Sequence, residues 1–249
     1  MKLVMSKKIL IGLAAAATFA STTLAAPAQL KFVNTNAWGQ SDSTRGGGPF
    51  EATPINQGAV QGLGTNGASA GNYITFCVER NEHIGNGATY NAKVNTVADK
   101  GGLGGGNPDP LDARTAFLYT AFLKGTLADK LASAGLSSFI VGDGVSGSAL
   151  QDAIWAIENE LDAEGGREGI RSQIGKDMYD LASAAVMQGG EWYGKGIGSV
   201  RILNLTDPNT GDTKQDQLIL IPLPTSAMLA LAGLLGVAYI SRKRSVLGV

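Results

Sequence analysis

The chain contains one cysteine, Cys77, and this residue is the first candidate for chemistry. It lies in the segment 75–79, where β-branched and aromatic residues predict a strand. A lone cysteine cannot form a disulfide within its own chain, so the structural interpretations are a small buried apolar residue or a disulfide between two chains. The second candidate is Gln151, at the start of a predicted helix, where a glutamine alone would be an ordinary surface residue.

Two short motifs surround these residues. The first is an aromatic–Cys–apolar triplet on a strand, Phe76-Cys77-Val78. The second is a Gln-x-x-Ile-Trp motif at the start of a helix, which runs from Gln151 to Trp155. With the predicted helix at 115–120 between them, the two motifs resemble the bacterial thioester domain family of surface adhesins, over roughly residues 70–205.

The resemblance implies an internal thioester between Cys77 and Gln151. The sulfur attacks the side-chain carboxamide carbon, ammonia leaves, and an amine or hydroxyl on a surface or matrix polymer or protein later takes the acyl group. Phe76 and Trp155 are expected to form an apolar wall that excludes water, and N–H groups at the helix start are expected to stabilise the oxyanion. This is attachment without turnover, so we expect neither an enzyme nor a cofactor.

Two other functions remain open. One is an inert structural protein of the surface or matrix, in which Cys77 is a buried free thiol. The other is a carbohydrate-active hydrolase, for which the candidate carboxylates are Glu79, Glu82, Glu158 and Glu160. Glu158 and Glu160 are two positions apart on a helix and do not face each other, so we expect Glu158 to join Asp162 and Glu164 on a solvated face.

The composition excludes several kinds of site. The chain has 249 residues, with one histidine and one cysteine. It therefore cannot hold a multi-cysteine zinc or iron–sulfur site or a site with two histidines, and we expect no metal. The histidine, His83, has no serine-nucleophile motif near it and is predicted to lie in an exposed loop.

The N-terminal segment has the pattern of a secretory signal peptide. A basic region with three lysines precedes an apolar run at 9–20, which small residues follow at 21–28. This order predicts a signal peptide over residues 1–28, with cleavage after Ala25 or Ala28. The protein is therefore expected to be exported.

The C-terminal segment, 221–249, has the pattern of a membrane anchor. No charged residue occurs from Gln217 to Ser241, which predicts a transmembrane helix whose basic end stays in the cytoplasm. The motif before the helix and the basic end resemble the bacterial PEP-CTERM sorting signal, with Pro-Leu-Pro in place of Pro-Glu-Pro: Pro222, Leu223, Pro224, Thr225, Arg242, Lys243 and Arg244. The resemblance implies an exosortase-type protease and delivery to the cell surface or extracellular matrix, with transient or permanent anchoring; the alternative is a plain membrane anchor.

The charge of the body differs from that of the whole chain. The whole chain carries a net charge of -1. Without the three N-terminal lysines and the three basic residues at 242–244, 14 basic residues remain against 21 acidic ones, which gives -7. An acidic body argues against nucleic acid as a partner.

The body, residues 29–220, is predicted to be an α+β domain. Strands and helices alternate in long blocks, which predicts an antiparallel β-sandwich or barrel-like sheet with an inserted helical layer. Glycine-rich stretches at 46–48 and 101–106 are predicted to be loops. The predicted strands are 30–33, 73–79, 200–205 and 217–220, and the predicted helices are 110–124, 148–161 and 170–187.

Overall fold

The computed structural model describes residues 27–34, 47–56, 68–161 and 165–221. Most of the predicted signal peptide and nearly all of the predicted sorting segment, with the motif at 222–225 and the basic end at 242–244, lie outside these residues. The first strand already begins at Ala28, whose Cα pairs with Ala92. Cleavage after Ala25 would therefore leave this strand whole, whereas cleavage after Ala28 would remove its first residue.

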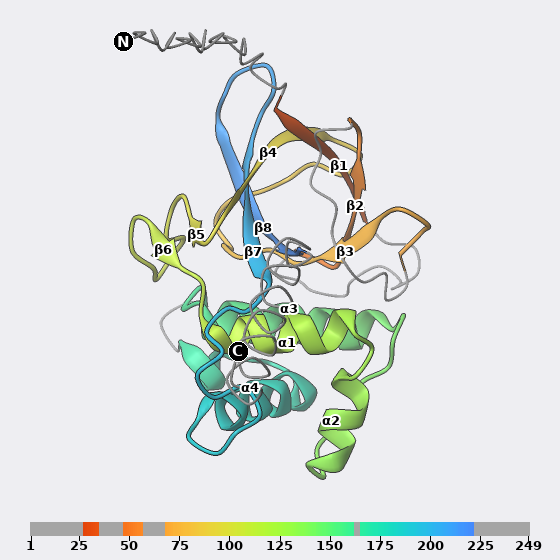
Figure 1. Cartoon of the computed structure of the whole chain (residues 1–249), viewed down its shortest axis with the longest axis vertical. Helices are drawn as coiled ribbons and strands as arrows, with labels where there is room; N and C mark the ends of the chain where they lie inside the picture. The colour runs from red at the N-terminus through yellow and green to blue at the C-terminus, as the bar shows by residue number, and fades with distance from the viewer. Residues whose placement is uncertain (1–26, 35–46, 57–67, 162–164, 222–249) are drawn as a thin grey trace, which may run out of the picture.

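A six-stranded antiparallel sheet forms one half of the molecule (Figure 1). Its strands run in the order β3-β2-β1-β4-β7-β8. They are β1 (Ala28–Asn34), β2 (Phe50–Pro54), β3 (Tyr73–Thr75), β4 (Thr89–Asn95), β7 (Val200–Thr206) and β8 (Thr213–Leu220). A separate two-stranded sheet pairs β5 (Val97–Ala98) with β6 (Asp109–Pro110).

The sheet curls until its two edges meet. Just after β3, Cys77 pairs with Gln217 of β8 in an antiparallel bridge. Backbone hydrogen bonds flank this bridge, from Val78 N to Asp216 O at 2.9 Å and from Leu218 N to Phe76 O at 3.0 Å. Of the two predicted forms, the barrel-like sheet therefore agrees with the described residues. We call this contact between the two edges the seam.

The helices form a layer on one side of the sheet (Figure 1). They are α1 (Ala113–Leu123), α2 (Leu127–Ser133), α3 (Gly144–Ile157) and α4 (Gln173–Val186), with a short 3-10 helix at Gly166–Gly169. Tyr119 joins α1 to both edges of the sheet, because its hydroxyl oxygen lies 2.8 Å from Ile74 O and 3.1 Å from Leu218 O. The α+β class is confirmed, and none of the helices among the described residues is long and apolar enough to cross a membrane.

The helix starts differ from the predicted ones. Asp112, Asp143 and Ser172 are the N-caps of α1, α3 and α4, each accepting a hydrogen bond from a backbone N–H in the first turn. The sequence pattern of this region also offers Ser146 or Ser148 as the cap of α3, but the structure shows Ser146 donating its backbone N–H to Asp143. Helix α3 therefore begins about one turn earlier than predicted, at Gly144, a residue type with low helix propensity.

Candidate functional site

The side chain of Gln151 lies against Cys77 at the seam. Its Oε1 accepts a hydrogen bond from the Cys77 backbone N–H at 2.9 Å, and its Nε2 donates to the Cys77 carbonyl oxygen at 2.9 Å. Both residues have no exposed surface. The two predicted reacting residues are therefore in direct contact, although they are 74 positions apart in the chain.

A second backbone N–H, from Gly48, donates to the same oxygen of Gln151 at 3.1 Å. Two backbone N–H groups on one carbonyl oxygen are the arrangement that stabilises an oxyanion in acyl transfer. The prediction that a helix start supplies these donors was wrong. Gln151 lies in the middle of α3, where its neighbours' N–H groups are already bonded within the helix, so the donors come from segments packed against it.

The backbone approaches the site closely at residues 47 and 48, which requires glycine at residue 47 and favours it at residue 48. A Cβ at position 48 would lie 3.2 Å from Gln151 Oε1 and 3.1 Å from Thr75 O. At position 47, where φ is +94°, a Cβ would lie 2.5 Å from a ring carbon of Trp155. The sequence indicated only a loop here, and the glycine run was the one signal for a backbone that approaches a site closely.

The sulfur of Cys77 faces a second glutamine. Gln217 Nε2 lies 3.4 Å from Sγ, and Gln217 is also fully buried. Burial raises the pKa of the Cys77 thiol to about 12, which hydrogen bonds from Gln217 and the Gly48 N–H oppose. At neutral pH the free residue is therefore a neutral thiol, and its proton must leave for the sulfur to attack.

The two residues predicted to form an apolar wall have different surroundings. Trp155 is buried and covers Gly47, next to the Gln151 side chain. Phe76 is buried too, but its ring packs edge-to-face on Phe122 and Tyr119 of α1, with centroids 5.2 and 6.4 Å away. Trp155 lies against Gly47, beside the aliphatic part of the Gln151 side chain, whereas Phe76 anchors the seam to the helical layer.

A pair of buried acids lies beside this site. Glu79 Oε2 accepts a hydrogen bond from the Asp216 backbone N–H at 2.8 Å. The carboxylate of Asp216 accepts from Asn204 Nδ2 at 2.7 Å and from Leu205 N at 3.2 Å. Burial, reinforced by the neighbouring Asp216, raises the pKa of Glu79 far above its usual range, so Glu79 keeps its proton at neutral pH.

The other candidate carboxylates have structural partners. The prediction that Glu158 is solvated was wrong: Glu158 and Glu160 are both buried, while Asp162 and Glu164 lie outside the described residues. Glu158 accepts from the Asp112 N–H at 3.3 Å, and burial raises its pKa to about 8. Glu160 accepts from the N–H groups of two loop residues, Arg80 and Leu103.

The two remaining polar candidates are at the surface. Glu82 forms an ion pair with Lys100 at 3.1 Å. His83 lies in an exposed loop, as predicted. The glutamates proposed for a hydrolase therefore bind backbone N–H groups, another acid or a lysine. In the part of the chain that the structure describes, no cluster of three His, Cys, Asp or Glu could hold a metal ion.

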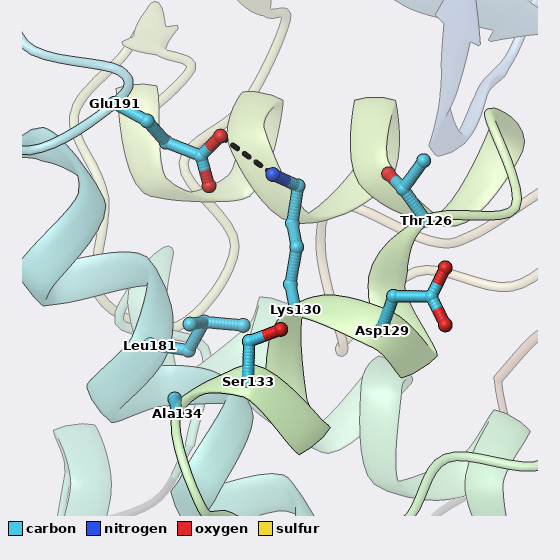
Figure 2. Close-up of a pocket in the computed structure, with 7 residues that line it drawn as sticks. All are labelled: Thr126, Asp129, Lys130, Ser133, Ala134, Leu181 and Glu191. Atoms are coloured by element: carbon cyan, nitrogen blue, oxygen red, sulfur yellow. Dashed lines mark hydrogen bonds and ion pairs between the residues drawn. The ribbon is translucent and has the colours of Figure 1, made fainter.

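An open groove lies away from the seam, between α2, α4 and the chain at residue 191. Its volume is about 470 Å³, and Figure 2 shows Lys130 reaching from α2 to Glu191, 2.5 Å away. Both side chains are partly exposed. The residues that line the groove are Thr126, Asp129, Lys130, Ser133, Ala134, Leu181 and Glu191, and the site at Cys77 shares none of them.

No protein family model, curated protein or solved structure matches the chain.

Proposed function

We propose that this protein is exported to the cell surface or extracellular matrix and attaches covalently to a partner through a thioester between Cys77 and Gln151. One observation carries the proposal: the Gln151 carboxamide is held against Cys77, with two backbone N–H groups on its oxygen. These two donors satisfy both lone pairs of the buried amide oxygen, and they also lie where negative charge would develop on that oxygen during acyl transfer.

The bond forms by acyl transfer within the chain. The Cys77 sulfur attacks Cδ of Gln151, and the negative charge that develops on Oε1 is stabilised by the N–H groups of Gly48 and Cys77. The C–N bond then breaks, and the nitrogen leaves as ammonia after taking up the thiol proton. Close packing supplies the effective concentration that makes an unreactive carboxamide a usable acyl donor.

The thioester would later react with an amine or hydroxyl of a partner. The nucleophile attacks Cδ, the C–S bond breaks, and its electron pair and the nucleophile's proton go to the Cys77 sulfur. The partner stays attached to the former glutamine side chain by an amide or ester bond. Each chain reacts once, so the protein acts in attachment and not as an enzyme.

Export and sorting rest on the two ends of the sequence. Residues 1–28 would direct secretion, and the motif at 222–225, the apolar segment and the basic end at 242–244 would be recognised by an exosortase-type protease. The apolar segment would hold the body outside the cell, in the membrane, before or instead of release. The net charge of -7 on the body suits this location and argues against nucleic acid as a partner.

The test is the intact mass of the full-length chain after export, compared with a Cys77→Ala variant. Both chains undergo the same processing at their ends, so the difference between their masses isolates the site. The wild type should be lighter than its sequence predicts by one ammonia, and the variant should not. Methylamine should add to the wild type, at Gln151 by peptide mapping, and should release one thiol.

A wild-type chain with the plain sequence mass and a thiol that titrates in denaturant would contradict the proposal. That outcome would favour the inert structural protein with a buried free Cys77.

A further inference from the structure

A second hollow in the surface adjoins the groove of Figure 2, where the end of α1 meets the chain that follows α4. Its volume is about 250 Å³, and three lysines line it: Lys124 at the end of α1, Lys130 on α2, and Lys195 between α4 and β7. We call it the lysine hollow. It shares Thr126, Lys130 and Glu191 with the groove, so the two form one continuous depression.

The lysine hollow is positively charged, although the body around it is acidic. Lys130 is paired with Glu191, which is the only acid among the described residues that line the hollow. Lys124 and Lys195 are exposed, and neither forms an ion pair with another residue of the described part of the chain. Two positive charges therefore have no counter-charge, on a body whose net charge is -7. Charges that the fold does not pair are available to a ligand, and here they favour an anionic one.

An aromatic side chain gives the lysine hollow an apolar surface beside these charges. Trp192 is partly buried, its indole N–H donates to Gly196 O at 2.7 Å, and its ring packs on Phe117 with the centroids 5.9 Å apart. These contacts orient the ring before any ligand binds. Lys195 Nζ lies 5.2 Å from the centroid of the same ring. A sugar acid offers the complementary combination, because its carboxylate is attached to a ring with apolar C–H groups.

The groove that continues from the lysine hollow suits the hydroxyl groups of a sugar chain. Thr126 and Ser133 contribute hydroxyls to its lining and Asp129 contributes a carboxylate, and the side chains of Ser133 and Asp129 are exposed (Figure 2). Hydroxyls and carboxylates can bind sugar hydroxyls as acceptors, and the hydroxyls also as donors. By contrast, Asp129 would repel a nucleic acid, whose charges are as close as about one per 1.7 Å of duplex.

We propose that this depression binds a strand of an acidic polysaccharide. A uronate carboxylate lies at Lys124 and Lys195, its sugar ring lies against Trp192, and the sugars that follow extend along the groove. The binding is non-covalent and reversible. It uses none of the residues at the seam, so it does not depend on the thioester, and it would hold a matrix polymer at the surface of an exported protein.

The test measures the affinity of the full-length chain, in detergent micelles, for oligomers of polygalacturonate by isothermal titration calorimetry. The matched ligand is the same oligomer with methyl-esterified carboxylates, which keeps the sugar rings and removes the charges. We expect the acid form to bind about tenfold more tightly than the ester and to dissociate as salt is added. No binding of the acid form, or equal affinity for the two forms, would overturn the proposal.

A double variant, Lys124→Gln with Lys195→Gln, removes the two unpaired charges. Both side chains are exposed, so the variant should fold as the wild type does, which urea titration checks. Its affinity for the acid form should fall about tenfold. The control is Lys31→Gln with Lys93→Gln, the same change of charge at exposed positions on β1 and β4, and it should keep the wild-type affinity.

Two results with these variants would contradict the site. Equal losses in both double variants would mean that the polymer is attracted only by the overall charge of the protein. Wild-type affinity in both would mean that it binds elsewhere. A single-stranded DNA oligonucleotide with the same number of charges should bind more weakly than polygalacturonate. Equal or tighter binding of DNA, lost in the same variant, would assign the lysine hollow to nucleic acid instead.

The same samples separate this site from the proposed covalent attachment. Capture by a thioester leaves a gain in mass that survives denaturant, whereas the binding proposed here leaves none. A wild-type chain that lacks the ammonia deficit therefore contradicts the proposed function and does not affect this proposal. Polygalacturonate that stays attached in denaturant and is not released by salt would overturn it.

Discussion

The seam and the groove solve the problem of polar groups in opposite ways. At the seam, the carboxamides of Gln151 and Gln217 are fully buried and uncharged. In the groove, Lys130 and Glu191 form an ion pair (Figure 2), and both side chains are partly exposed. Neutral amides can be removed from water when their donors and acceptors are matched, whereas isolated charges cannot.

The acids next to the seam follow the same rule, that a buried polar group is either neutral or fully hydrogen-bonded. Glu79 is almost completely buried, and it stays there by keeping its proton. The negative charge of Asp216 is met by N–H groups from Asn204 and Leu205. The seam therefore offers a dry site with oriented N–H groups, and the charge of the neighbouring Asp216 is bound by donors of its own, which suits a hydrolysable acyl bond. The groove offers none of these conditions.

The largest effect should follow the loss of the buried carboxamide. Gln151→Ala removes three hydrogen bonds and leaves the N–H groups of Gly48 and Cys77 without their acceptor. Made in a Cys77→Ser background, so that no cross-link contributes, it should lower the free energy of unfolding by about 4 kcal/mol in urea titrations. Gln173→Ala, at an exposed helix position, should change it by less than about 0.5 kcal/mol. Equal effects of the two variants would mean that the carboxamide is not held as described.

A smaller effect should appear as a dependence on pH. Glu79 has a raised pKa in the folded state, so above the ordinary value of 4.5 the unfolded chain releases a proton that the folded chain retains. The free energy of unfolding should therefore fall as the pH rises from about 5 to 8, by up to about 1.4 kcal/mol per pH unit. Urea titrations across this range should show a shallower slope for Glu79→Gln. Glu82→Gln, a change outside the acid pair, should keep the wild-type slope of the free energy of unfolding against pH. If Glu79→Gln keeps that slope as well, Glu79 is not the cause of the pH dependence.

The smallest effect should come from the groove. Lys130→Met breaks the ion pair with Glu191. Both side chains are partly exposed, so water can replace the interaction. The free energy of unfolding should change by no more than about 1 kcal/mol, and the change should shrink as salt is added. Glu191→Gln should behave in the same way. A loss as large as that of Gln151→Ala would show that the groove, like the seam, depends on a polar contact for its structure.

Local patterns predicted the elements with strong signals. The helices α1, α3 and α4 and the strands β7 and β8 were predicted, because their apolar patterns lie in residues that are adjacent in the sequence. Strands β2 and β4 and the short α2 were missed, because Asn, Pro and Lys dilute their patterns. Their place is decided by pairing with distant strands, which no local window contains.

In the candidate site, too, the residues in local motifs were predicted and those placed by long-range contacts were not. Cys77 and Gln151 stood out because one is unique in the chain and both lie in recognisable motifs. Gly48 and Gln217 did not stand out: one belongs to a glycine run, the other to an ordinary strand, and both reach the site through the curling of the sheet. The burial of Glu158 was also not predicted. Its carboxylate accepts a hydrogen bond from the Asp112 N–H, and the apolar periodicity of the helix that ends at Glu158 contains no information about this distant donor.

The position of Gln151 in the chain has a mechanical consequence once a partner has been captured. Capture breaks the C–S bond, so the partner is then attached to the chain through the side chain of residue 151 alone. If the protein is pulled between a membrane at its C-terminal segment and a partner captured at Gln151, the covalent path of the force runs from residue 151 to that segment. The strands and helices between residues 77 and 151 lie outside that path, and they would carry no tension even under loads that stretch the rest of the chain.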